Sequence, residues 1–171
     1  MIGLPKPEAG APDEPWPAAL ALHGFAGASD PCAPSESSLI GPMQIALLAA
    51  NGFVTIAPDF IGMNGRGGAS TAPHAPLLGE QVAIGAWDAM RAGRSLLAGE
   101  LGLRLQGEPR DDLVIWGASQ GGHAAFSVGA RGEPDDVPLR LDAGAGAGQG
   151  GAAVQLDVQA RRGAGALPDP G

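Results

Sequence analysis

The sequence is short of cysteine, histidine, tyrosine and positive charge. Among 171 residues there is one cysteine, Cys32, three histidines and no tyrosine. A single cysteine excludes an internal disulfide framework and any metal site built from cysteine alone. Ten basic side chains oppose 18 acidic ones, which gives a net charge of -8. This balance argues against nucleic-acid binding, which needs clustered lysine and arginine.

Long apolar runs are also missing. No run approaches the ~18 residues that a membrane span requires. Residues 1–17 contain five prolines and lack the basic and apolar pattern of a signal peptide. The hydrophobic share of 44% is nevertheless sufficient for a folded core. We therefore expect a folded chain without a membrane span.

Aromatic residues are unevenly distributed along the chain. All seven lie at or before Phe126, and residues 131–171 are instead rich in glycine and alanine. Such a segment loses much conformational entropy on ordering and gains little burial in return. The sequence therefore predicts three regions, which are a Pro-rich extended arm over 1–17, an ordered body over 18–130 and a weakly structured tail over 131–171.

Within the body, short apolar runs alternate with longer segments of helical pattern. Strands are expected at 18–22, 53–57 and 112–116, and helices at 43–51, 78–101 and 120–130. Apolar strands separated by helices form mainly parallel sheets that are covered on both faces. The predicted fold class is α/β, with a mainly parallel sheet flanked by helices.

The strongest chemical signal is the turn Gly-Ala-Ser-Gln-Gly at 117–121, which matches G-x-S-x-G between an expected strand and an expected helix. In such a turn a strained backbone lifts the serine hydroxyl outward, and the glycines let strand and helix approach closely. The backbone N–H of Gln120 at the helix start faces the position where an oxyanion forms. We predict Ser119 as a nucleophile and Gln120 as a backbone donor.

A glycine-rich loop at residues 23–27, His-Gly-Phe-Ala-Gly, follows the first strand of the body and is called the HG loop below. A loop at this place offers a backbone N–H, that of Phe25, to the same oxyanion. A plain strand-ending turn has a similar composition, so the functional interpretation depends on the pairing with the Ser119 turn. His23 is expected to shape the loop through a hydrogen bond.

Three stretches together resemble the α/β-hydrolases, namely HGFAG at 23–27, GFVTIAPDFIGMNG at 52–65 and WGASQGGHAAF at 116–126. The likeness is to bacterial lipase- and esterase-like members, including the secretory lipase type, which carry a stretch similar to DPCAPS at 30–35. It covers roughly two-thirds of the chain. The resemblance implies hydrolysis of small-molecule or lipid esters by acyl transfer through Ser119, without a cofactor.

The family pattern is incomplete in this chain. In α/β-hydrolases the triad acid and histidine follow the serine, yet no histidine follows His123. His123 is expected to pack against the sheet or a neighbouring helix, and His74, in a Pro-rich loop before the serine, is a poor base candidate. Asp59 is expected to brace its own loop. The remaining acid candidates are Asp135, Asp136, Asp142 and Asp157.

We therefore expect an incomplete α/β-hydrolase fold, shortened by truncation or by a change of reading frame near the tail. One alternative is a non-catalytic or truncated hydrolase-like domain that lacks the triad histidine and acid. Another is a minimal enzyme whose base comes from His74 or from a partner chain. A sheet without its last strands has an uncovered edge, which favours self-association.

Other site patterns are weaker. Residues 146–151 match G-x-G-x-x-G, but no βαβ unit surrounds them, so a dinucleotide site is not expected. No two histidines or acids have the spacing of metal ligands around His74 or His123. We therefore expect neither a cofactor nor a metal.

Overall fold

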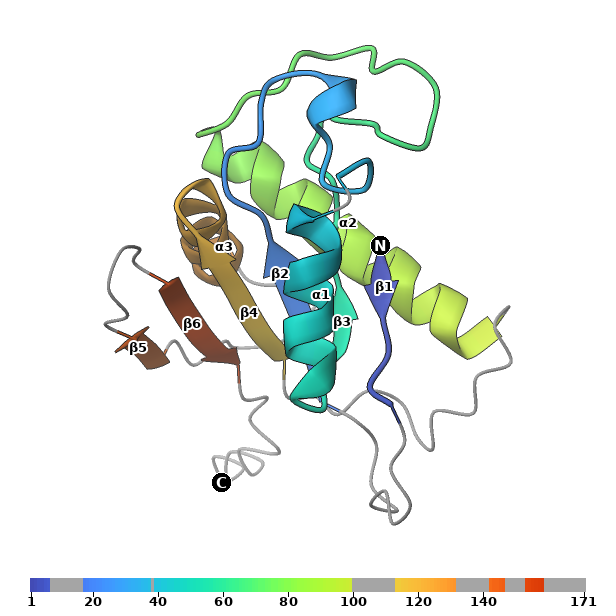
Figure 1. Cartoon of the computed structure of the whole chain (residues 1–171). Coiled ribbons are helices and arrows are strands. Elements are labelled where there is room, and N and C mark those ends of the chain that lie inside the picture. Colours follow the sequence, from blue (N-terminus) through green and yellow to red (C-terminus); the bar gives the residue numbers. More distant parts are fainter. Residues whose placement is uncertain (7–16, 38, 100–112, 132–141, 147–152, 159–171) are drawn as a thin grey trace, which may run out of the picture.

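The computed structural model describes residues 1–6, 17–37, 39–99, 113–131, 142–146 and 153–158 (Figure 1). Three helices, one 3-10 turn and six strands lie within these ranges. In chain order they are β1 (Ile2–Gly3), β2 (Ala18–Leu22), η1 (Asp30–Cys32), α1 (Ile40–Ala50), β3 (Val54–Ile56), α2 (Gly79–Gly99), β4 (Leu113–Ala118), α3 (Gln120–Arg131), β5 (Asp142–Gly146) and β6 (Ala153–Val158).

The strands form one sheet in the order β1-β3-β2-β4-β6-β5. Its centre is parallel, because β2 pairs with β3 on one side and with β4 on the other, so that Leu20 lies opposite Ile56 and Ile115. The pairings farther out, β1 with β3, β4 with β6 and β6 with β5, are antiparallel. The α/β class is confirmed, and the three strands predicted in the body are the three parallel ones.

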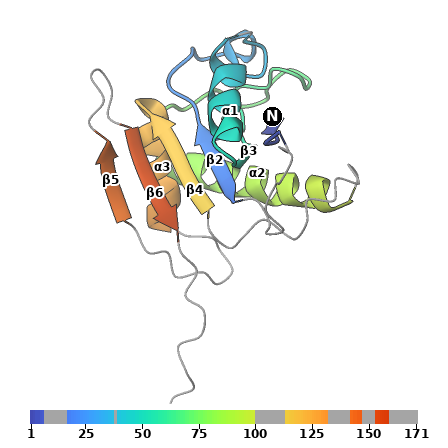
Figure 2. The ribbon, with the colours of Figure 1, turned by 60° about the horizontal axis from the view of Figure 1, so that its bottom comes forward.

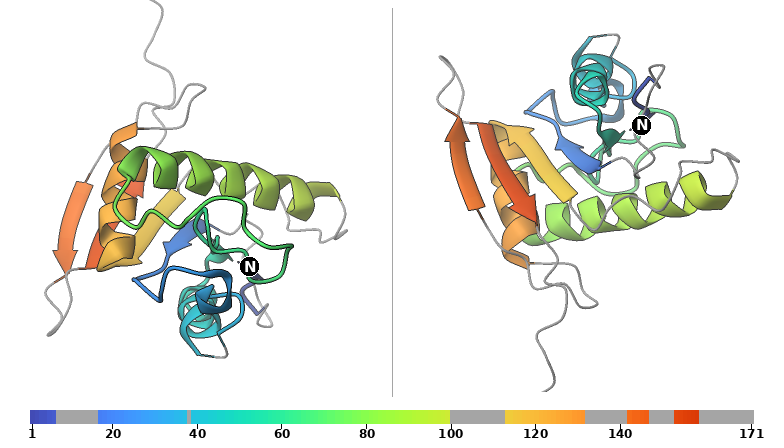
Figure 3. Two further views of the ribbon diagram at one scale, coloured as in Figure 1. Left: turned by 90° about the horizontal axis from the view of Figure 1, so that it is seen from above. Right: turned by 90° about the horizontal axis from the view of Figure 1, so that it is seen from below.

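Helices cover both faces of the sheet. Figure 3 shows α1 on one side and α2 with α3 on the other. The alternation of side chains along β2 explains this arrangement, since Leu20 and Leu22 pack in the core under α2 and α3. Ala19 and Ala21 point to the opposite face, where they meet Leu48 of α1.

Helix boundaries agree with the sequence pattern except at the start of α1. This helix begins at Ile40 rather than at the expected residue 43. Pro42 occupies its first turn, where a missing backbone N–H costs no intrahelical hydrogen bond. The helix α2 spans 79–99 against the expected 78–101, and residues 100 and 101 lie outside the described ranges.

The arm and the tail both contain strands that our prediction did not include. β1 joins the sheet beside β3, and β6 and β5 extend it beyond β4 (Figure 2). β6 reads Ala-Val-Gln-Leu-Asp-Val, an apolar/polar alternation typical of a strand, which our prediction overlooked. β5 is a Gly/Ala segment without such alternation, and it can still add to the edge of β6 because strand pairing uses backbone N–H and C=O groups. Residues 7–16, 132–141, 147–152 and 159–171 lie outside the described part of the chain.

Candidate functional site

The turn between β4 and α3 holds Ser119 in an unusual conformation. Its φ is +54°, and it is the one residue other than glycine with positive φ among those that the structure describes. The left-handed region costs an L-amino acid on the order of 1–2 kcal/mol. The side chain is exposed to solvent. The packing around the turn must therefore offset this conformational cost.

Two glycines provide that packing. A Cβ at Gly117 would lie 2.2 Å from the carbonyl oxygen of Gly121, and a Cβ at Gly121 would lie 2.0 Å from that of Leu22. Real Cβ atoms do not approach backbone so closely. The end of β2, the end of β4 and the first turn of α3 therefore touch through their main chains, as the G-x-S-x-G pattern predicts.

The HG loop lies directly beside the serine. A Cβ at Gly24 would be 3.4 Å from the Ala118 carbonyl oxygen and 3.8 Å from Cβ of Ser119. The ring of Phe25 is 60% exposed. Within the described part of the chain, no hydrogen bond uses the backbone N–H of Phe25 or Gln120. The structure thus brings the HG loop next to Ser119 and Gln120, and leaves both predicted donor amides without a partner there.

His23 anchors the HG loop from inside the protein. Its Nδ1–H donates to the Gly24 carbonyl at 2.7 Å, and its ring stacks on Phe60 with the centroids 4.0 Å apart. Only 1% of the residue is exposed. Its Nε2 has no hydrogen-bond partner among the described residues. The expected hydrogen bond of His23 is therefore confirmed.

Burial gives His23 a pH-dependent contribution to stability. Desolvation lowers its pKa, outweighing the hydrogen bond to Gly24 and the charge of Asp59, which raise it, while nearby His74 lowers it further. The unfolded chain therefore takes up the proton more readily, and stability falls as the pH drops below about 6.5.

We expect the free energy of unfolding to fall between pH 7.5 and 5.5, with this histidine adding at most about 1.4 kcal/mol per pH unit. Urea denaturation at a series of pH values measures the slope. His23→Phe should flatten it, whereas the exposed control His123→Gln should leave it as in the wild type. Equal slopes for His23→Phe and the wild type would remove His23 as the cause.

His74 lies inside the protein next to the Ser119 turn. It is 8% exposed, its Nδ1–H donates to the Ile61 carbonyl at 3.1 Å, and its Nε2 accepts from the Gln120 side-chain amide at 2.9 Å. The Ser119 hydroxyl makes no hydrogen bond to any residue that the structure describes. Both ring nitrogens of His74 are therefore engaged elsewhere, and the ring does not serve as a base for Ser119 in this arrangement.

The Ser119 hydroxyl likewise makes no hydrogen bond to another triad candidate within the described ranges. His123 is exposed, and its Cε1 lies 3.6 Å from the position of a Cβ on Gly79, so it stands beside the start of α2 as expected. Asp135 and Asp136 lie outside the described residues. Asp142 and Asp157 are opposite each other in register on β5 and β6.

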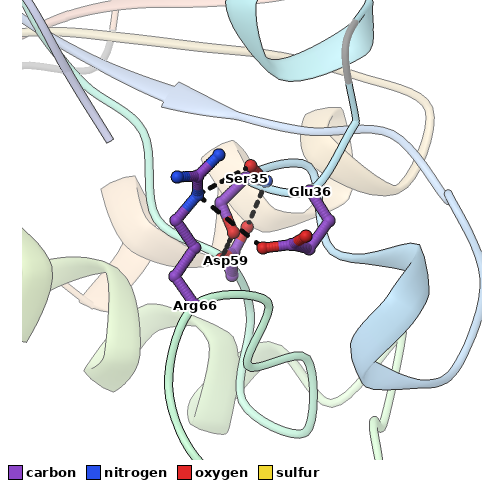
Figure 4. A network of polar contacts seen from close by, with 4 residues as sticks. All are labelled: Ser35, Glu36, Asp59 and Arg66. Atoms are coloured by element: carbon purple, nitrogen blue, oxygen red, sulfur yellow. Dashed lines mark hydrogen bonds and ion pairs between the residues drawn. The ribbon is translucent and has the colours of Figure 1, made fainter.

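Asp59 connects its own loop to the loop that carries Ser35. Its carboxylate accepts from the backbone N–H of Ser35 at 3.0 Å and from the Ser35 hydroxyl at 2.5 Å (Figure 4). Arg66 donates to the Ser35 carbonyl at 3.3 Å and lies 3.7 Å from Glu36. The prediction that Asp59 braces its loop is confirmed.

Asp30 makes a second connection between loops. It accepts from the backbone N–H groups of Asn64 at 2.8 Å and Ser70 at 2.9 Å, and from the Ser70 hydroxyl. These bonds, foremost that of the Ser70 hydroxyl, hold the pKa of Asp30 below its ordinary value. A shallow pocket of about 270 Å³ opens beside this contact, lined by residues 28–30, Gly62 and residues 70–73.

The connection from His74 through Gln120 to the serine turn was not predicted from the sequence. The local signal at His74 was a histidine between two prolines, which indicates a fixed loop and gives no partner. The partner is 46 residues away along the chain. The stacking of Phe60 on both histidines, with centroids 4.0 Å from His23 and 6.1 Å from His74, was likewise not predicted.

Comparison with known proteins gives no family. No protein-family model, no curated protein and no solved structure matches the chain. Within the described ranges, no group of three or more His, Cys, Asp or Glu side chains is arranged to hold a metal ion. No helix in those ranges is long and apolar enough to cross a membrane.

Proposed function

We propose that the protein is a serine hydrolase of the α/β-hydrolase type that acts on carboxylic esters, with Ser119 as the attacking group. The observation that carries the proposal is the conformation of Ser119. An exposed serine held at positive φ, between a parallel strand and a helix start, is an energetically costly arrangement. Strain of this kind concentrates at sites of chemistry.

The proposed step is acyl transfer. The Ser119 oxygen forms a bond to the ester carbonyl carbon, the carbonyl oxygen becomes negative, and the backbone N–H groups of Gln120 and Phe25 stabilise it. The intermediate then breaks its bond to the alkoxide, which takes a proton from water and leaves as the alcohol. A water molecule next attacks the acyl carbon, the bond to the Ser119 oxygen breaks, and the acid is released as Ser119 regains its proton. The hydroxyl proton of the exposed serine passes to water, because no histidine in the described part of the chain accepts it. Without a bonded base the attack is slow, by about six powers of ten relative to a complete triad.

A second candidate is a hydrolase-like domain without catalysis. The observation in its favour is the engagement of His74, whose ring nitrogens are occupied by Ile61 and Gln120. Such a domain retains the Ser119 turn and the HG loop but does not turn over esters.

A fluorophosphonate probe distinguishes the two candidates. We expect slow, covalent labelling of the wild-type chain, loss of more than about nine-tenths of it in Ser119→Ala, and unchanged labelling in the control Ser127→Ala. The Ser127 hydroxyl donates to the His123 carbonyl in α3 and is not at the turn. Absence of labelling in folded wild-type protein, or equal labelling in Ser119→Ala, favours the non-catalytic domain.

A further inference from the structure

Four buried side chains form a continuous connection behind the Ser119 turn. His23 stacks on Phe60, Phe60 stacks on His74, and His74 accepts a hydrogen bond from the side chain of Gln120. All four are less than 9% exposed. The two ends of the connection belong to the HG loop and to the first residue of α3, which are the two segments that carry the proposed donor amides.

His74 is held in place independently of Gln120. Its Nδ1–H bonds to the carbonyl of Ile61 at 3.1 Å. Its backbone is also closely packed, because a Cβ at Gly62, where φ is +84°, would lie 2.3 Å from the His74 nitrogen. A ring held by the Nδ1 hydrogen bond and by stacking on Phe60 can define the position of the group that bonds to its Nε2.

Gln120 is the residue whose position matters most for the proposed oxyanion. Its side chain is buried, and Oε1 has no partner within the described residues, so the bond from Nε2 to His74 is the one polar side-chain contact recorded for it. A buried amide that makes one hydrogen bond is oriented by that bond. The same residue begins α3 and provides the free backbone N–H.

We propose that His74 is a positioning residue, which fixes the Gln120 side chain and thereby the direction of the Gln120 backbone N–H toward the oxyanion of Ser119. The expected effect of His74 on kcat rests on the proposed function. Its expected effect on the orientation of Gln120 rests on the contacts in the structure alone. A donor amide acts mainly in the transition state, so loss of its alignment lowers kcat and leaves KM nearly unchanged. A misplacement of about 1 Å is sufficient for a change on the order of 100-fold.

The test uses the full chain and p-nitrophenyl butyrate. His74→Phe keeps an aromatic ring against Phe60 but removes both hydrogen bonds of His74. We expect its kcat to fall about 10- to 100-fold, with KM within about threefold of the wild type. The matched control His123→Phe changes an exposed histidine one helical turn from Ser119 and should leave both constants unchanged. A wild-type kcat in His74→Phe, or a change confined to KM, overturns the proposal.

A second variant covers the case in which His74→Phe does not fold. Gln120→Met keeps the backbone N–H and removes the side-chain amide, so it should show the same loss of kcat. The two substitutions combined should lose no more than either alone, because they break one connection. Losses that add independently contradict the proposal.

A backbone ¹⁵N–¹H spectrum separates this inference from the proposed function. We expect the Gln120 backbone amide resonance to move in His74→Phe and to stay in place in His123→Phe, whether or not the protein hydrolyses esters. If the wild type neither labels nor hydrolyses but this resonance moves, the function fails and the positioning stands. If hydrolysis occurs and the resonance does not move, the positioning fails and the function stands.

Discussion

Gly121→Ala is expected to destabilise the protein by at least about 3 kcal/mol, a large part of the stability of an ordinary domain. The added Cβ would lie 2.0 Å from the carbonyl oxygen of Leu22 and 2.8 Å from that of His23. Both atoms belong to main chain, so no rotamer change can relieve the overlap. Helix propensity acts in the opposite direction, because alanine is favoured over glycine in a helix by roughly 1 kcal/mol. The free energy lost to the steric overlap exceeds the gain from the helix propensity of alanine.

Urea denaturation followed by circular dichroism measures this effect, and Gly99→Ala is the matched control. Gly99 is also helical, at the end of α2, and a Cβ there meets nothing within 4 Å. The control should be neutral or up to about 1 kcal/mol more stable than the wild type. A Gly121→Ala variant with wild-type stability would show that the main chains at the end of β2 and the start of α3 do not touch, so that their packing does not hold Ser119 at positive φ.

The parallel centre of the sheet was predictable because its signals are local. Each of β2, β3 and β4 is a short apolar run bounded by glycine, proline or charge, and each is followed by a helical pattern. Among the outer strands, β6 alternates apolar and polar residues over 154–158, a local strand signal that our prediction overlooked, whereas β5 has no signal of this kind. β5 reads Asp-Ala-Gly-Ala-Gly, which shows no apolar alternation, and its place depends on the edge offered by β6. Backbone pairing of this kind is independent of side-chain pattern.

In the candidate site, too, the features with local sequence signals were predictable and those that depend on long-range contacts were not. The Ser119 turn and the adjacent HG loop were predictable, because the glycines at 117, 121 and 24 meet geometric needs within a few residues or at the ends of neighbouring parallel strands. The burial of His74 and its hydrogen-bond partners were not predictable. Its burial depends on Ile61 and Gln120, which reach it through the fold and share no sequence motif with it.

Phe60→Ala is expected to lower the free energy of unfolding by about 3–5 kcal/mol, which is the second large effect. The Phe60 ring is 4% exposed in the core beside α2 and fills the space between two buried imidazoles. Its removal loses the transfer free energy of a phenyl group and leaves a cavity that the fixed main chain around His74 cannot close. Phe60→Leu retains most of the apolar volume and should cost less than half as much. Urea denaturation of the wild type, Phe60→Ala and Phe60→Leu measures the free energy of unfolding of each.

The same substitution also changes the environment of His23. Burial is the main reason that its pKa is lowered, and the Phe60 ring covers one face of the imidazole. In Phe60→Ala, water reaches that face, so the pKa of His23 should rise toward its ordinary value, and in Phe60→Leu it should stay low. A proton NMR titration of the histidine ring signals measures both. If Phe60→Ala unfolds the chain, Phe60→Val, which removes less apolar volume, gives the same comparison. An unchanged His23 titration in a folded small-residue variant would show that elements other than Phe60 keep water from the HG loop.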